Sequence, residues 1–397
     1  MRWIFVVLLA VHGLVHLMGF AKAFELAELP QLAQPISRGM GVAWLGAALA
    51  MLATAVLFAA GQRGWWAAAL AAVTLSQVVI VSSWGDARLG TIANALVLAG
   101  VVYGFASQGP LSFRSEYRRA VGERLARSAP TTTLTDEDLA HLPDPVRRYV
   151  RLSGAVGQPR VNHFASTWRG RIRGTPEDPW MEFTARQHNF IDGPARLYLM
   201  DARRGAFPVD VFHVFREGAA TMRVRLLSLF PLVSAAGPEL TKAESVTLFN
   251  DLCVLAPGAL VDHAIEWHAL DGRTVEARYT VGENTVGATL CFNVAHELVD
   301  FVSDDRLAAS ADGSLFTRRR WSTPLSDYRD FGSRRAGARG EGRWHLDDGE
   351  FVYVEAELLD LRTNAPASRP AGARPGGPGR GLSSLPSPRS RRPPRSS

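Results

Sequence analysis

Apolar residues are concentrated in four stretches within the first quarter of the chain. They are Trp3–Phe20, Gly39–Ala60, Trp65–Ser83 and Gly90–Ala106, and each is about the length that crosses ~30 Å of hydrocarbon as a helix. The first 110 residues carry only eight charged side chains, most of them between the stretches: Arg2, Lys22, Glu25, Glu28, Arg38, Arg63, Asp86 and Arg88. The pattern predicts a four-helix transmembrane bundle over residues 1–110.

The pattern changes after the last apolar stretch. Residues 111–158 are predicted to form a helical connector, since a Pro-Asp-Pro sequence at 143–145 is typical of a helix start and Gly154 of its end. Tyr149 and Val150 lie between them as apolar anchors. We therefore expect short helices that join the bundle to a second domain.

From about Val161 onward, apolar residues recur at every second position, as they do in a strand with one buried face. Thr274–Val281 alternates apolar and polar residues, and turn signals such as Asp271-Gly272 separate such segments. Further strand candidates lie at 161–173, 180–190, 195–201, 207–216, 219–227, 264–269, 288–294, 297–303, 315–322 and 352–358. The pattern predicts a mainly antiparallel β domain over residues 159–362, formed by a curved sheet or half-barrel.

One strongly apolar helix is expected to interrupt these strands. Pro238 precedes Thr241-Lys-Ala-Glu244, a capping-box pattern, and the apolar residues that follow cover most of the helix surface. A single helix of this kind is expected to pack on the concave side of the sheet. The predicted fold class is therefore α+β, with a transmembrane bundle followed by a β domain packed on one long helix.

The last residues, 363–397, are rich in Pro, Gly, Ser and Arg and are predicted to be disordered, since they contain too little apolar surface to fold. They also dominate the charge. Eight arginines follow Leu361, more than the net charge of +6 of the whole chain, and residues 1–110 contribute +2. Residues 111–360 therefore carry −4, which argues against nucleic acid as a partner.

Motifs of several protein classes are missing from the sequence. Cys253 and Cys291 are the only cysteines, and no CxxC or HExxH sequence occurs. Structural zinc and a disulfide framework are therefore not expected. Nucleophile elbow, P-loop and dinucleotide-binding motifs are also missing, so an enzyme is less expected than a binding protein, and the sequence indicates no particular cofactor.

The loops of the predicted bundle indicate its orientation. With four spans, both ends of the bundle lie on one side of the membrane. That side carries seven basic residues (Arg2, Arg63, Arg114, Arg118, Arg119, Arg124 and Arg127), and the other carries three (Lys22, Arg38 and Arg88). By the positive-inside rule, both termini and the β domain are expected in the cytoplasm of a bacterial inner membrane.

Several short motifs occur in a characteristic order along the chain. They are His12-Gly-Leu-Val-His16-Leu-Met-Gly19-Phe20, Trp84-Gly-Asp86-Ala-Arg-Leu-Gly90-Thr-Ile-Ala-Asn94, Leu248-Phe-Asn-Asp251, Glu266-Trp267, Ser303-Asp304-Asp305-Arg306 and Thr323-Pro324-Leu325-Ser326. With these motifs the chain resembles a bacterial family of uncharacterised membrane proteins. The resemblance implies a domain of unknown function over about residues 1–362 and no particular chemistry. The residues 334–343, where a tighter linker into Trp344 is expected, depart from it by their arginine and glycine content.

The first candidate site lies within the predicted bundle. His12 and His16 lie four residues apart and share a helical face, and Gln77, Asp86 and Asn94 add polar groups in or near the third and fourth spans. Ionisable groups at membrane depth suggest a functional site, such as a metal, haem, quinone or proton site. The alternative is hydrogen bonding between helices, and for Asp86 a helix cap or ion pair with Arg88.

The second candidate site lies in the β domain. It comprises Asn250, Asp251, Glu266, Asp304, Asp305 and Arg306. Paired carboxylates could transfer protons or hold a divalent cation. However, adjacent aspartates in a strand point to opposite faces, so a turn in which Arg306 forms a salt bridge is the competing interpretation.

Three functions remain open from the sequence. A curved sheet over one apolar helix could bind a membrane lipid or another apolar molecule, which is the function that we favour. The first alternative is a membrane redox or metal-binding protein that uses His12 and His16. The second is a scaffold without a small-molecule site.

Overall fold

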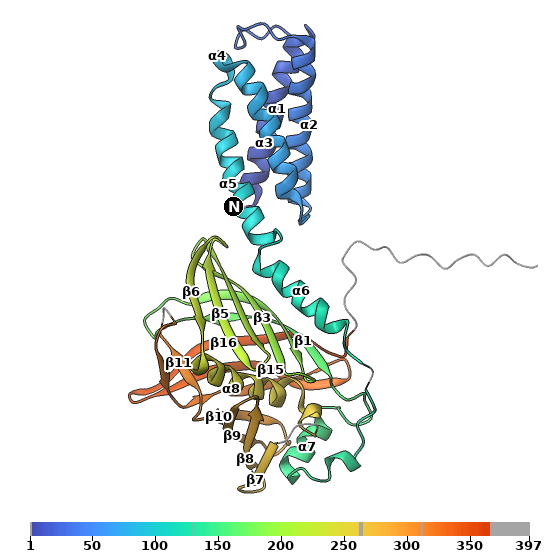
Figure 1. Ribbon diagram of the computed structural model, residues 1–397, viewed down its shortest axis with the longest axis vertical. Helices are drawn as coiled ribbons and strands as arrows, with labels where there is room; N and C mark the ends of the chain where they lie inside the picture. The colour runs from blue at the N-terminus through green and yellow to red at the C-terminus, as the bar shows by residue number, and fades with distance from the viewer. Residues whose placement is uncertain (1, 130, 262–264, 311–312, 366–397) are drawn as a thin grey trace, which may run out of the picture.

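The computed structural model describes residues 2–129, 131–261, 265–310 and 313–365. A group of helices precedes one large antiparallel sheet, so the fold is α+β (Figure 1). Nearly all of the segment for which disorder is predicted lies outside the described residues; only 363–365 are described, and Thr363 is the last residue of the final strand.

Four of the described helices are long and apolar enough to cross a membrane. They are α1 (Arg2–Ala23), α2 (Arg38–Ala59), α3 (Trp65–Ser82) and α5 (Gly90–Gln108), with the short α4 (Trp84–Ala87) before α5. Small residues let these helices approach closely: a Cβ atom at Gly19 would collide with the Trp44 indole, and one at Gly41 with Ala23. The N-terminal end of α1 and the C-terminal end of α5 lie at the same end of the bundle, the end nearer the sheet (Figure 1).

Two helices connect the bundle to the sheet, α6 (Phe113–Leu125) and α7 (Asp144–Leu152), with a 3₁₀ turn at Glu137–Leu139 between them. The side chains of Phe113 and Tyr117 pack on Phe212 and its neighbours in the sheet. Tyr149 is fully buried on the other side of the domain, where its hydroxyl donates to the Cys253 carbonyl at 2.8 Å. The connector is therefore packed against both sides of the β domain.

The main sheet has fourteen strands and is antiparallel throughout. Its order is β6-β5-β4-β3-β2-β1-β16-β15-β13-β10-β9-β8-β7, and β14 pairs with β15. A separate pair is formed by β11 (Leu307–Ala309) and β12 (Phe316–Arg318). The strands of the main sheet are β1 (His163–Ile172), β2 (Met181–Phe190), β3 (Ala195–Arg204), β4 (Phe207–Arg216), β5 (Ala219–Leu226), β6 (Phe230–Ala236), β7 (Ile265–Ala269), β8 (Thr274–Val281), β9 (Asn284–Phe292), β10 (Leu298–Ser303), β13 (Trp321–Ser322), β14 (Leu325–Phe331), β15 (Arg334–Leu346) and β16 (Gly349–Thr363).

The expected long helix is α8 (Pro238–Leu255), followed by a 3₁₀ turn at Pro257–Val261. Fourteen of its side chains are buried, and Phe249 stacks on Tyr279 in the main core. The capping-box interpretation is wrong, because the helix begins at Pro238 and the Thr241 hydroxyl donates to the Gly237 carbonyl from within the first turn. Glu244 is therefore free to turn into the domain interior.

One segment differs from the sequence-based expectation. Residues 334–343, expected to form a linker, belong to β15, a long strand in the middle of the sheet. The even positions from 336 to 342 are small residues: Ala336 and Ala338 are buried, and a Cβ atom at Gly342 would press on the Tyr353 ring. Over 338–343 small residues alternate with charged ones, a pattern that a search for alternating apolar residues does not detect.

Candidate functional site

The inner face of the sheet, defined here as the face that carries α8, is apolar over a wide area. One row of directly paired residues crosses five strands on this face: Trp168, Ala185, Met200, Val211 and Val224. The next row contains Phe183, Ala202, Val209 and Leu226. Paired residues share a face of the sheet, so these side chains form one continuous surface.

We call this surface the inner apolar patch. Several of its large side chains are only partly buried, because α8 contacts the sheet beyond the patch, at the rows that include Gln187 and Asn189. Figure 1 shows α8 across the lower part of the sheet and β5 and β6 rising from it toward the bundle. The patch comprises Trp168, Ile172, Phe183, Ala185, Met200, Ala202, Val209, Val211, Val224, Leu226, Val354 and Ala356.

A buried charged cluster lies between α8 and the sheet. Arg196 of β3 donates through Nε to Asp251 Oδ2 at 2.7 Å, and its Nη1 lies 3.3 Å from Glu244 Oε2. Arg306 reaches the other oxygen of Glu244 at 3.2 Å. Two guanidinium groups and two carboxylates thus balance in charge, which a buried ionic group requires.

The state of Glu244 is set by these neighbours. Burial alone would raise the pKa of Glu244, but His213 at 3.7 Å and the charges of Arg306 and Arg196 lower that pKa overall. The amides of Gln187 and Asn189 donate to Asp251 at 2.7 and 3.0 Å. The polar atoms of the cluster are therefore largely satisfied, except that Arg306 Nε is buried without an acceptor among the described residues.

The structure separates the residues of the second candidate site. Asp251 and Arg306 join the charged cluster, whereas Asn250 donates to Thr323 at 2.7 Å. Asp304 pairs with Arg320, and Asp305 with Arg318. Glu266 is exposed on β7 and lies 3.9 Å from Arg278. The proposed pairing of Arg306 with the adjacent aspartates is thus wrong, because its side chain turns inward to Glu244.

The structure brings together four residues of the first candidate site. His12 and Asn94 are 2.9 Å apart, and Ser76 Oγ lies 2.9 Å from His16 Nε2 and from Asn94 Oδ1. Asn94 also donates to Gln77 at 2.9 Å. This network joins α1, α3 and α5 by hydrogen bonds. Asp86 is not part of it, since its carboxylate accepts from the Gln34 backbone at 2.8 Å.

The chemistry available to these groups is limited by their existing partners. Within the described ranges, no group of three or more His, Cys, Asp or Glu side chains is arranged to hold a metal ion. His16 Nδ1 is 2.7 Å from the His12 carbonyl and its Nε2 contacts Ser76. Both nitrogens of His16 are therefore engaged in hydrogen bonds.

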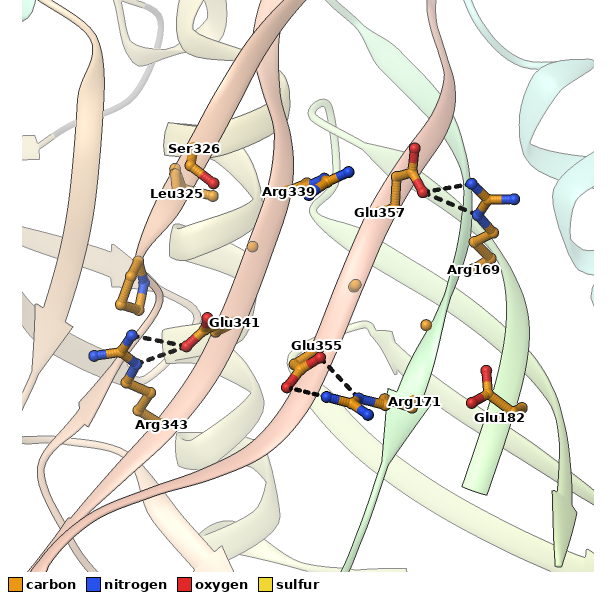
Figure 2. Close-up of a pocket in the computed structure, with 14 residues that line it drawn as sticks. Arg169, Arg171, Glu182, Leu325, Ser326, Arg339, Glu341, Arg343, Glu355 and Glu357 are labelled. Carbon is orange, nitrogen blue, oxygen red and sulfur yellow. Dashed lines mark hydrogen bonds and ion pairs between the residues drawn. The ribbon is translucent and has the colours of Figure 1, made fainter. Parts of the chain in front are cut away.

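A hollow of about 620 Å³ lies on the outer face of the central strands. Figure 2 shows ion pairs along its walls, such as Arg169 with Glu357 and Arg171 with Glu355, the latter at 2.8 Å. Four arginines and four glutamates line it: Arg169, Arg171, Arg339, Arg343, Glu182, Glu341, Glu355 and Glu357. Because these charges balance, the hollow selects for neither an anion nor a cation.

Sequence reasoning missed several of the residues that complete these networks. The sequence pattern assigns Glu244 to a helix cap, and Arg196, His213 and Ser76 belong to no motif. The one usable signal was Glu244 itself, an acid followed by a long apolar helical run, since a buried carboxylate requires a basic partner.

Comparison with known proteins places the chain in a family. A family model described as "Family of unknown function (DUF6544)" matches residues 132–356, and the chain belongs to this family. The match covers most of the β domain and leaves out the histidine and asparagine motifs of the bundle. No curated protein matches the sequence.

Three solved structures resemble the chain at low identity. A domain assigned to outer membrane lipoprotein sorting, from Vibrio parahaemolyticus, is 10% identical with a TM-score of 0.31, covering 54% of this chain and 88% of that one. A DUF1329 family protein from Desulfovibrio piger is 14% identical with a TM-score of 0.33, covering 58% and 94%. A LolA superfamily protein from Nitrosomonas europaea is 9% identical with a TM-score of 0.24, covering 55% and 91%. Likenesses this weak say nothing about what the chain binds.

Proposed function

We propose that this member of a family of unknown function is a multi-pass membrane protein that binds a lipid or another apolar molecule on the inner apolar patch. The observation that carries the proposal is the position of α8, which covers the rows that include Gln187 and Asn189 and leaves large apolar side chains such as Trp168 and Val224 partly exposed. Water contact with such side chains costs about 25 cal/mol per Å². An apolar ligand that covers the patch removes this cost.

The charged cluster supports a ligand with a polar end. Arg306 lies beside the patch, since its guanidinium is 5.4 Å from the Trp321 ring and the Trp321 indole donates to the Tyr353 hydroxyl at 3.2 Å. Tyr353 lies beside Val354 of the patch, because the side chains of both contact the position of a Cβ atom at Gly342. The free donor of Arg306 Nε could bond to an oxygen at the polar end of a lipid.

The composition of the bundle supports a membrane location. Its four helices are apolar, and the seven basic residues predicted for one side lie at the end that faces the β domain or in the connector. By the positive-inside rule this side is the cytoplasm, so we place the β domain in the cytoplasm of a bacterial inner membrane. The ligand would then come from the cytoplasmic leaflet.

A photoactivatable phospholipid tests the binding proposal. The full chain is reconstituted in vesicles that contain the probe, illuminated and digested, and the modified peptides are identified by mass spectrometry. We expect modification of β2–β5 as well as of the bundle. Modification confined to the bundle would contradict lipid binding by the β domain.

A matched pair of variants assigns the modification to the inner face. Val224→Glu places a charge within the patch, whereas Thr184→Glu places the same charge on the exposed outer face of the same sheet. Val224→Glu should reduce the modification of β2–β5 severalfold, and Thr184→Glu should leave it unchanged. Equal effects of the two variants would assign the label to the outer surface.

The metal or redox alternative draws less support from the geometry. The imidazoles of His12 and His16 are engaged by Ser76, Asn94 and the His12 carbonyl, so a metal would have to displace these bonds. Metal analysis and an absorption spectrum of the purified full chain test this alternative, and a stoichiometric metal lost in the His12→Ala, His16→Ala variant would establish it.

A further inference from the structure

The ends of two hairpins in the β domain expose large apolar side chains. Phe207 begins β4 and is 56% exposed, and Phe230 begins β6 and is also 56% exposed. Leu229 and Leu232 are 40% and 50% exposed. Exposed apolar side chains are ordinary when scattered, but a group on adjacent loops indicates an interaction surface.

These hairpin ends lie close to the end of the last apolar helix. Arg114 Nη1 donates to the carbonyl of Ser107 in the last turn of α5 at 3.0 Å, and its Nη2 contacts Asp210 of β4 at 3.0 Å. The Ser228 hydroxyl, in the turn between β5 and β6, donates to the same carboxylate. The side chains of Arg114 and Asp210 therefore link the turn that holds Ser228 to the last turn of α5. Figure 1 shows the upper ends of β5 and β6 beside this junction.

Basic side chains accompany the apolar ones. Arg203 and Arg204, at the end of β3 next to Phe207, are exposed and form no ion pair with any residue that the structure describes. Exposed arginines beside aromatic residues suit the interface of a membrane, where the guanidinium meets phosphate and the ring enters the acyl boundary.

We propose that the β3–β4 and β5–β6 hairpin ends dock into the surface of the bilayer in which α5 ends. The inference rests on the proposed insertion of the bundle, since α5 then places the hairpin ends at headgroup level. Phe230 pairs with Leu226 and Leu226 with Val209, both in the inner apolar patch. Docking therefore joins the acyl region of the bilayer to the patch, and a lipid passes between them without crossing water.

Fluorophores attached to single cysteines test the docking in reconstituted vesicles. The label is placed by Phe230→Cys or Phe207→Cys in a Cys291→Ser background, since Cys253 is buried, and the vesicles contain phospholipids with nitroxide-labelled chains as quenchers. Arg216→Cys is the matched control, because it is exposed at the other end of β4, about 30 Å from Phe207 at ~3.3 Å per residue. Leu98→Cys, exposed on α5, reports insertion of the bundle by itself.

The proposal predicts quenching at positions 207 and 230 that is severalfold stronger than at position 216 and approaches that at position 98. Quenching at position 98 alone would overturn the docking and leave the spanning bundle intact. Absence of quenching at all four positions would overturn both. Hairpin labels that resist the quencher but crosslink two chains would assign the surface to a second copy of the protein and would also overturn the proposal.

Discussion

Arg114 and Asp210 lie 96 residues apart in the sequence and 3.0 Å apart in space, and their contact joins the bundle end of the connector to the β domain. The same guanidinium reaches Asp201 at 2.6 Å and the Ser107 carbonyl at 3.0 Å. Asp210 is almost fully buried. Arg114, from which three oxygen atoms accept hydrogen bonds, therefore adds a polar contact to the packing of Phe113 and Tyr117 on Phe212 that also joins the connector to the sheet.

Replacement of Arg114 by methionine should destabilise the protein. It leaves the buried Asp210 without a counter-charge, whereas Asp201 keeps Arg186 at 3.8 Å. We expect the loss to cost about 1–3 kcal/mol of the free energy of unfolding. Thermal unfolding of the full chain in detergent measures this. Arg119→Met is the control, since Arg119 is exposed on the same helix, and an equal loss in both variants would show that the junction contributes nothing specific.

Glu244 should make the β domain sensitive to acid. Its pKa in the folded state is lowered by His213, Arg306 and Arg196 despite burial, so the unfolded chain binds the proton more readily. The stabilisation is complete above the ordinary pKa of a glutamate, about 4.3, and is lost as the pH falls from that value toward the lower folded pKa. Glu244→Gln should be less stable at neutral pH and should show a shallower loss in acid. If the free energy of unfolding fell equally in Glu244→Gln and in the unmodified chain from pH 6 to pH 3, the assignment to Glu244 would be contradicted.

His188 should add a second pH dependence at milder pH. Burial and the nearby His163 lower the pKa of His188 to about 3, and its ring stacks on Phe190 at 4.8 Å beneath the end of α6. Because the folded state resists protonation, stability is complete above about pH 6.5 and declines below it. The loss is about 2 kcal/mol by pH 5, at 1.36 kcal/mol per pKa unit.

The variant His188→Phe tests this origin of the pH dependence. It keeps the aromatic contact with Phe190 and removes the proton site. Its unfolding temperature should change much less than that of the unmodified chain between pH 7 and pH 5, and an unchanged pH dependence would assign the effect to other groups.

Gly19 should be required for packing of the bundle. A methyl group there would collide with Trp44, so Gly19→Ala must separate α1 from α2 and should cost about 1–3 kcal/mol. Gly39→Ala is the matched control, since nothing lies within 4 Å of a Cβ atom at that position. The free energy of unfolding, measured in detergent, distinguishes the two variants. Equal values for both would show that the close approach of the helices is unimportant.

The candidate sites show which contacts the sequence could predict. The spacing of His12 and His16 placed both rings on one face of α1, and the structure has their side chains together, with ring centroids 4.7 Å apart. The sequence could not identify Ser76 as the shared partner of these histidines, because serine is common in apolar helices and the contact depends on how α3 packs. For the same reason nothing in the sequence linked Arg196 to Asp251, 55 residues away.

The strands show the same division. Alternation of apolar and polar residues predicts strands such as Thr274–Val281, because one face of the strand is buried and the other is exposed to solvent. It fails for β15, whose inward positions are alanine and glycine because Leu325 and Tyr353 pack across them. The shape of the neighbouring side chains, rather than the strand's own hydrophobicity, determines which residues fit there.

The sequence by itself determined the division of the chain into an apolar helical part and a strand-rich part, and the presence of one long buried helix. These properties follow from local periodicity, because each residue's burial depends first on the helix or strand to which it belongs. Only the tertiary structure decided which rows of the inner face α8 covers, which charges meet beneath it, and that the Phe207 and Phe230 hairpin ends lie beside α5. Those features depend on strand register and helix packing, which bring together residues far apart in the chain.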